Sequence, residues 1–311
     1  MTASGVESAT ESFRNFQLDG NDSRLSSGAL ALLKEGQGQF NQSDSARPSS
    51  LPEVSFAAPG VQRVSARDTN NPNLAMGNPS GATPDVANAD NYLIVRDQYT
   101  MSYNKDHKTP NWVSWQLDSD WLGSVGRTGP FVPDQSLPAG FGKASPKDYT
   151  NSGYDRGHNI PSGDRTKSTE DNETTFLMSN VAPQTADNNR GPWEKFESYC
   201  RELAGQGKEL YIVDGSTGTK GTISDGINVP DEFWKVVVVL PQKGMTAADV
   251  NADTQVIAVE VPNVSGIRRD DWRKYTSTVS DIEKRTGYHF LSNLSANVAN
   301  SLENKSFSNQ N

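Results

Sequence analysis

The chain has 311 residues and a formal net charge of -9, from 29 Lys and Arg against 38 Asp and Glu. Its length permits one large core or two ordinary ones, which excludes a peptide-sized or disulfide-stapled scaffold. The acidic balance disfavours a protein that binds nucleic acid through a broad basic face. No run approaches the roughly 20 apolar residues of a membrane helix. A single cysteine, Cys200, allows neither an intrachain disulfide nor a thiolate metal cluster.

Residues 1–75 are predicted to be a poorly structured N-terminal extension. They contain no Trp, Tyr, Cys or His, only four Phe, and 12 serines, so they have few large side chains to bury in a core. A short helix is predicted over Ser27–Glu35. Met1–Ala9 lacks the basic residues of a secretory signal. Localisation is left open, with release by a non-classical route as a hypothesis, and the folded domain is placed at residues 76–311.

Strand patterns begin after residue 90. Tyr92–Tyr103 and Trp112–Leu117, on either side of a polar turn with Pro110, predict a hairpin. Three further strands are short, rich in β-branched residues and bounded by Gly, Pro or Asp: Glu209–Val213, Trp234–Leu240 and Gln255–Val261. These strands favour a mixed or antiparallel sheet.

Helical patterns are fewer than strand patterns. Pro192–Ala204 has one apolar stripe, formed by Trp193, Phe196, Cys200 and Leu203, which predicts a packed helix with an inert, buried thiol. Ser280 and Glu283 have the spacing of a capping box for a second helix that ends at Gly287. Because helices and strands do not alternate regularly, the sequence predicts an α+β fold.

Three polar segments gather the residue types that carry chemistry: Tyr154–Asn159 (YDRGHN), Ser179–Gln184 (SNVAPQ) and Asn188–Trp193 (NNRGPW). In this order and spacing they resemble the DNA/RNA non-specific endonucleases, the ββα-metal nucleases with a D-R-G-H motif, and in particular their cyanobacterial members. The resemblance runs from about Gly77 to Leu302. It implies a ββα-metal nuclease fold, with the sheet flanked by helices.

His158 is the predicted general base. A neutral imidazole can accept a proton from water near pH 7, and the family uses the histidine at this position as its base. Gly157 before it is expected to let the backbone approach a substrate closely. The alternative for His158 is a hydrogen-bonded core histidine, which is also the interpretation given to His107 and His289.

The cation is predicted to be Mg²⁺, with Mn²⁺ as a substitute. No HxH, CxxC or paired-Asp pattern in the three segments would hold zinc or calcium. Magnesium keeps several waters, so a single Asn carbonyl can hold it, and the resemblance assigns that ligand to Asn189. The alternative is that Asn188 and Asn189 only cap the helix that follows.

Glu197 and Arg201 lie eight and twelve residues after Asn189, so helical spacing places all three on one side. Glu197 can then hold metal-bound waters and Arg201 can reach phosphate, whereas the simpler alternative is a surface ion pair between the two. The resemblance makes Arg127 a phosphate clamp. It also adds Asn180 to the catalytic set, and Gln184 and Arg190 to the substrate-binding or supporting set. Asp155 and Arg156 are expected to orient the strand of His158.

The sequence therefore predicts a metal-dependent endonuclease that cleaves DNA and RNA and, as the family does, leaves 5′-phosphate ends. Two alternatives stay open. The enzyme could be a toxin delivered by a secretion apparatus, with an apparatus component that binds residues 1–75 and an inhibitor or immunity protein as partners. The chain could also be a catalytically silent binding module, although it retains both His158 and Asn189.

Overall fold

The structure, a computed structural model, describes residues 71–307. The helix predicted over Ser27–Glu35 lies outside these residues. The central feature is a seven-stranded sheet in the order β1-β2-β3-β6-β9-β10-β11, in which every neighbouring pair is antiparallel. Its strands are β1 (Tyr92–Val95), β2 (Thr100–Asn104), β3 (Thr109–Leu117), β6 (Glu209–Thr217), β9 (Glu232–Leu240), β10 (Gln255–Pro262) and β11 (Thr276–Ser277). The α+β prediction is confirmed.

Two small sheets and five α-helices complete the described part of the chain. The small sheets are β4 (Asp155–His158) with β5 (Val181–Gln184), and β7 (Gly221–Ile223) with β8 (Ile227–Val229). The helices are α1 (Thr169–Thr174), α2 (Ala186–Asn188), α3 (Glu194–Gly205), α4 (Val279–Thr286) and α5 (Ala296–Glu303), with a π-helical turn at Asn189–Trp193. Short 3₁₀ turns lie at Pro72–Leu74, Ala89–Asn91, Ser119–Trp121, Pro146–Tyr149, Ser162–Asp164, Met178–Asn180, Ala247–Asp249 and Trp272–Tyr275. Within residues 71–307 no helix has the length and apolarity needed to cross a membrane.

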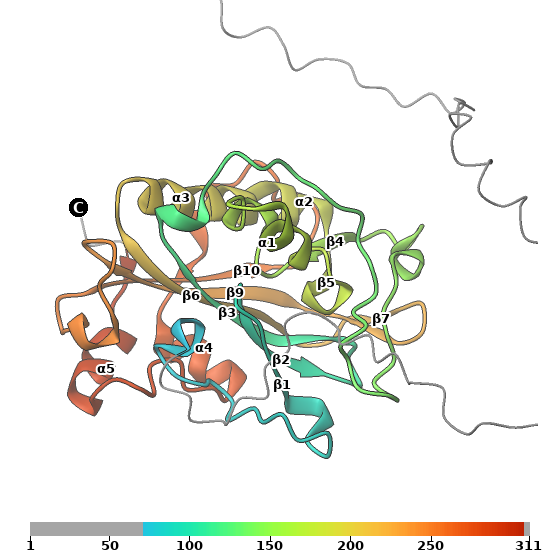
Figure 1. The fold of residues 1–311 in the computed structure, drawn as a ribbon, viewed down its shortest axis with the longest axis horizontal. Helices are drawn as coiled ribbons and strands as arrows, with labels where there is room; N and C mark the ends of the chain where they lie inside the picture. The colour runs from blue at the N-terminus through green and yellow to red at the C-terminus, as the bar shows by residue number, and fades with distance from the viewer. Residues whose placement is uncertain (1–70, 308–311) are drawn as a thin grey trace, which may run out of the picture. The chain divides into compact units, whose positions relative to one another are not determined.

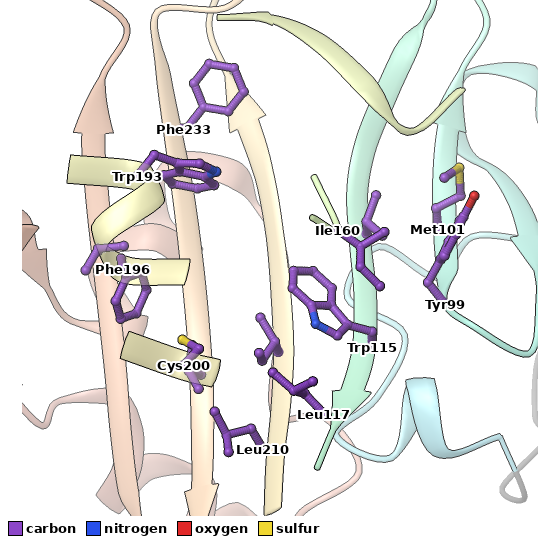
Figure 2. Packing of buried hydrophobic residues seen from close by; sticks show 14 of the residues in the cluster. Tyr99, Met101, Trp115, Leu117, Ile160, Trp193, Phe196, Cys200, Leu210 and Phe233 are labelled. Carbon is purple, nitrogen blue, oxygen red and sulfur yellow. The ribbon is translucent and has the colours of Figure 1, made fainter. Parts of the chain in front are cut away.

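The large sheet is covered on both faces. Helices α1, α2 and α3 lie on one side, with β4 and β5, whereas α4 and α5 lie on the other (Figure 1). Strand β9 therefore has a nearly continuous apolar sequence, because Phe233 and Val237 face the α3 layer while Trp234 and Val236 face the α4 layer. The apolar stripe predicted for α3 is buried against the sheet, as Figure 2 shows for Trp193, Phe196 and Cys200.

Two predicted elements have different bounds in the structure. Tyr92–Tyr103 is two strands, because the chain reverses where Arg96 donates its backbone N–H to Tyr99 O (2.9 Å). Pro110 lies inside β3, beside the irregular pairing at Ser102/Tyr103, where a missing N–H disturbs little.

The start of α4 also differs from the prediction. Its cap is Thr278, whose hydroxyl accepts from Asp281 N (3.1 Å), so Ser280 and Glu283 do not form the predicted box. The helix ends at Gly287, as predicted, in the left-handed conformation (φ 73°).

The folded domain includes residues just before the predicted boundary at 75/76. Asn73 is 3% exposed. Its side chain donates to Arg96 O and Asp97 O and accepts from Gln116 N (3.1 Å). Residues 71–75 therefore belong to the sheet's surroundings rather than to the extension.

Candidate active site

Strands β4 and β5 form the two-stranded unit that carries the D-R-G-H segment. They pair antiparallel, with Asp155 opposite Gln184 and His158 opposite Val181. The chain then passes through α2 and the π-helical turn into α3. This β-β-α arrangement brings three segments that are separate in the sequence around one site.

Gly157 is required by packing inside this unit. A Cβ at this position would lie 2.3 Å from Gln184 Oε1 and 3.1 Å from Ala182 O. Gln184 is fully buried and donates to Asn188 Oδ1 (3.0 Å). The expectation that Gly157 serves substrate approach is therefore wrong, because the space is filled by Gln184.

One cavity of ≈ 480 Å³ lies at the end of this unit. It brings together seven of the predicted site residues: Arg127, Arg156, His158, Asn189, Arg190, Glu197 and Arg201. Its remaining lining residues, Pro161, Ser162, Gly163 and Glu194, were not predicted. Glu194 could have been found from its i,i+3 spacing to Glu197, and the other three lie three to five residues after His158.

His158 is a half-buried imidazole at the wall of the cavity. Its ring packs against Phe131 and Phe176, with centroids 4.9 and 5.2 Å away. Nε2 is buried and has no hydrogen-bond partner within residues 71–307. Burial, followed by the charge of Arg127, lowers the pKa of His158 to about 3. The ring is therefore neutral at pH 7 and can accept a proton, and it lacks the hydrogen bond that the core-histidine alternative requires at this atom.

Arg127 lies on an exposed loop that is fastened across the cavity. Its guanidinium lies over Phe176, 4.7 Å from the ring centroid. The next residue, Thr128, donates its hydroxyl to Asn172 Oδ1 (2.8 Å), and Asn172 Nδ2 donates to Ser162 O (2.8 Å). Asn172 thus links the loop of Arg127 to the opposite, cavity-lining segment, a role that sequence reasoning missed.

Asn189 presents its side-chain oxygen without a partner. Its Nδ2 donates to Asp155 Oδ2 (2.9 Å), while Oδ1 accepts no hydrogen bond from the described residues. A carboxylate can only accept, so it fixes which end of the amide faces it. The helix-cap alternative does not hold, since the Asn188 side chain makes no capping bond to the π-helical turn that follows, and the N-cap of α3 is Trp193.

Asp155 therefore orients Asn189, rather than only the histidine strand as expected. It also accepts two hydrogen bonds from Arg190, at 2.8 Å from Nε and 2.6 Å from Nη2. Burial raises the pKa of Asp155, but the bonds from Arg190 and Asn189 outweigh burial and hold it below the usual range. This carboxylate is consequently ionised at neutral pH.

The oxygen donors in the cavity suit a hard cation. Within residues 71–307 no three His, Cys, Asp or Glu gather as a metal-binding group. The lining does offer the free Asn189 oxygen and the carboxylates of Glu194 and Glu197. Oxygen ligands, few in number and supplemented by water, are those that Mg²⁺ accepts.

Glu197 and Arg201 do not form an ion pair with each other. Arg201 Nη1 instead donates to Asp164 Oδ1 (3.0 Å), and its guanidinium lies over Gly163, where a Cβ would be 3.0 Å from Nη1. Burial raises the pKa of Glu197 to about 7, against the charges of Lys235 and Arg201. The prediction that one continuous helix runs from Asn189 to Arg201 is also wrong, because Gly191 (φ -123°, ψ -117°) interrupts it. Asn189, Glu197 and Arg201 nevertheless all line the cavity, as predicted.

Lys235 is a buried cation beneath α3. It is 1% exposed, its Nζ is 3.3 Å from Asp214 Oδ2, and it lies 4.4 Å from the Trp193 ring centroid. Its charge favours the ionised form of Glu197. Sequence reasoning missed this buried cation, although a single lysine within the apolar run of β9 could have indicated it.

Asn180 and Arg156 hold the unit together. Asn180 is fully buried and does not line the cavity; its amide bonds Ile160 N (3.1 Å), Ile160 O (3.0 Å) and Thr175 O (2.9 Å). The catalytic role predicted for Asn180 stays a prediction, and in the structure its amide is engaged with these backbone groups. Arg156 lines the cavity and donates to Pro146 O (3.0 Å).

A histidine-bearing strand pair followed by a helix, around a cavity with an oriented asparagine, defines the class of ββα-metal nucleases. The family model of the DNA/RNA non-specific endonucleases matches residues 77–297. The chain belongs to this family and is an endonuclease that hydrolyses phosphodiester bonds.

Relatives agree with this assignment, and a solved structure shares the fold. A "Nuclease" from Nostoc sp. is 53% identical over 233 residues, covering 75% of this chain and 85% of that protein. "Nuclease EXOG, mitochondrial" from Danio rerio is 34% identical over 209 residues, covering 62% of this chain and 59% of that protein. A crystal structure titled as the EndoG/EndoGI complex superposes with a TM-score of 0.62 at 21% identity, over 76% of this chain and 96% of that one.

Proposed function

We propose that the protein is a Mg²⁺-dependent endonuclease that hydrolyses both DNA and RNA and leaves 5′-phosphate ends. The observation that carries this proposal is one cavity lined by a neutral His158, by Asn189 with an amide oxygen that no described residue occupies, and by four arginines. Mn²⁺ is proposed as a substitute for Mg²⁺, because both accept oxygen ligands.

In this mechanism His158 accepts a proton from the attacking water. The water oxygen bonds to phosphorus as the bond to the 3′ oxygen breaks. The 3′ oxygen leaves with the bonding electron pair and takes a proton from solvent, so the phosphate stays on the 5′ side. Arg127 and Arg201 bind the phosphate oxygens with their guanidinium forks. A divalent cation bound at Asn189 would supply positive charge for the phosphate and the departing oxygen. Burial is the larger cause of the low pKa of His158, and the charge of Arg127 is the second. A phosphate beside Arg127 offsets only this second cause, and in that respect the base strengthens when substrate is present.

Cleavage of both DNA and RNA is consistent with the side chains that line the cavity. Apart from His158 its lining contains no aromatic side chain that could stack on a base. The charged groups address phosphate, which DNA and RNA share. We also propose an inhibitor protein for this chain, because the EndoG structure that shares its fold is titled as a complex with EndoGI.

The test is digestion of plasmid DNA and of RNA with Mg²⁺, with Mn²⁺ and with EDTA, followed by labelling of the product ends. We expect cleavage of both substrates and loss of cleavage in EDTA. The product 5′ ends should accept a labelled phosphate from a kinase only after their own 5′-phosphate is removed. His158→Ala should lower the rate by about 10²- to 10⁴-fold. Asn189→Ala should abolish most activity, whereas Glu197→Ala should retain activity that extra cation increases.

Matched controls are His289→Ala and Asn297→Ala, because both residues are exposed outside the cavity. Cleavage in EDTA, or equal rates for His158→Ala and His289→Ala, would contradict the proposal. Free 5′-hydroxyl ends would contradict its product assignment.

A further inference from the structure

Two arginines beside the active site have no partner in the part of the chain that the structure describes. Arg268 and Arg269 lie on the loop that follows β10 and are exposed. Neither guanidinium donates a hydrogen bond or forms an ion pair within residues 71–307. By contrast, Arg190 and Arg201 in the cavity are both paired with carboxylates. Two free guanidinium groups side by side are notable in a chain whose net charge is -9.

The backbone of this loop is nevertheless held firmly. Thr185 Oγ1 donates to Val264 O (3.0 Å), and Gly266 N donates to Asp187 Oδ2 (2.6 Å). At the other end Lys195 Nζ donates to the carbonyls of Arg269 (3.2 Å) and Asp270 (2.8 Å). All three anchors come from the α2–α3 segment that contains Asn189. The loop is thus fixed relative to the active site while its two cationic side chains are left unpaired.

Close packing places Arg268 next to the rim of the cavity. A Cβ on Gly191 would lie 2.8 Å from Arg268 Cα, so the approach requires glycine at that position. Gly191 directly follows Arg190, which lines the cavity. The charge of Arg268 also contributes to the low pKa of Asp155, the partner of Asn189 and Arg190.

We propose that Arg268 and Arg269 form a second phosphate-binding subsite, which holds the nucleic-acid backbone beside the scissile phosphate. The proposal rests on the nuclease function proposed above. A guanidinium is suited to phosphate oxygens because it presents planar, paired donors and is always charged. A preordered loop keeps the cost of binding low, since little backbone entropy is lost on contact. In an acidic chain, such local arginines supply the attraction that the molecule as a whole does not.

The test compares Arg268→Ala/Arg269→Ala with Arg273→Ala/Lys274→Ala. The control removes the same two charges from nearby exposed residues, but these are already paired with Asp271 and Asp270. Two substrates are used: a long duplex, and bis(p-nitrophenyl) phosphate, which has one phosphodiester. We expect the first variant to raise KM for the duplex about tenfold or more relative to the control. It should leave kcat and KM for the small substrate unchanged.

Salt dependence and direct binding supply independent readouts. The slope of log Kd against log salt for the duplex should fall by roughly 1.8, at about 0.9 per lost phosphate contact. Binding is measured in EDTA with His158→Ala as background, so that it can be tested even if the chain does not cleave nucleic acid. Arg268→Lys/Arg269→Lys should restore most of the slope, because the charges remain.

Unchanged duplex KM and salt slope would overturn the proposal and leave the loop to a protein partner. An equal loss on both substrates would also overturn it, because it would show that the arginines act at the reacting phosphate or through Asn189. Failure of the nuclease function itself has a different signature: the wild type would cleave neither substrate, while duplex binding in EDTA would still report on the subsite.

Discussion

Asp155→Asn should weaken cation binding without unfolding the protein. The carboxylate now accepts from Asn189 Nδ2 and so leaves Asn189 Oδ1 without a partner among the described residues. The introduced amide has nearly the same shape but also carries donors. It can bond Asn189 Oδ1 instead, which would occupy the oxygen that we propose as the metal ligand.

The expected magnitude follows from where this carboxylate lies. Loss of a partner that orients a metal ligand costs about 10- to 100-fold in metal affinity. The effect on folding should be small, because Arg190, the other partner, is 56% exposed and Asp155 is 18% exposed. A pair this open to solvent contributes at most about 1 kcal/mol, or roughly 2–4 °C in Tm for a domain of this size.

The assay is the activity of each variant as a function of Mg²⁺ concentration, supported by calorimetry of cation binding. Asp155→Asn should raise the half-activating concentration about 10- to 100-fold, and saturating cation should recover most of kcat. The matched control is Arg190→Ala, which removes the other partner of Asp155 but keeps its bond to Asn189. The reasoning is refuted if the two variants have the same cation requirement, or if Asp155→Asn needs no more cation than the wild type.

The remaining predictions concern protonation, the buried cation and the domain boundary. In the metal-free protein the His158 imidazole should stay neutral from pH 8 down to about pH 4, because its folded pKa is about 3; an NMR midpoint near 6.5 would disprove this. Glu197 has a folded pKa of about 7, so it is mostly protonated below pH 7, and a cation that favours its ionised form should bind more weakly as the pH falls. Glu197→Gln should remove that pH dependence from a calorimetric titration. Lys235→Met should lower the free energy of unfolding, measured by urea denaturation, by about 3–5 kcal/mol, because Asp214 is left as an unpaired buried charge. The double variant Lys235→Met/Asp214→Leu should recover most of the lost stability. Deletion of residues 1–70 should preserve activity and Tm, whereas deletion of residues 1–74 should cost about 1–3 kcal/mol by leaving the buried partners of Asn73 unsatisfied.

Features that depend on near neighbours could be predicted from the sequence. The β-branched run of β9 and the apolar stripe of α3 are set by local composition and period, and both elements formed where expected. The motif segments contain four of the residues that line the cavity, Arg156, His158, Asn189 and Arg190. The family resemblance added Arg127, and the spacing after Asn189 added Glu197 and Arg201. Cys200 is buried as expected, and burial raises its pKa to about 12.

Features set by distant partners could not be predicted. Strands β4 and β5 have four residues each, too few for a periodic pattern, and they are defined only by pairing with each other. The ion pair between Asp164 and Arg201 could not be predicted either, because the two residues are 37 positions apart in the sequence. Gly157 was misinterpreted because the side chain that fills its space, Gln184, lies on the partner strand.

Buried amides explain how such short strands hold catalytic groups in place. Asn180 links the segment after β4 to the turn after α1, and Asn188 ties the end of α2 to β10 through Val261 O and Pro262 O. Asn263, just after β10, makes a second connection to this unit: it donates to Pro183 O in β5 and accepts from Thr185 N. An amide side chain both donates and accepts, so it can pair backbone groups that a four-residue strand leaves unsatisfied. Asn→Asp changes at these positions would keep the shape but lose the donors. The position of His158 therefore depends on residues that never touch the substrate, and the D-R-G-H segment alone does not build the site.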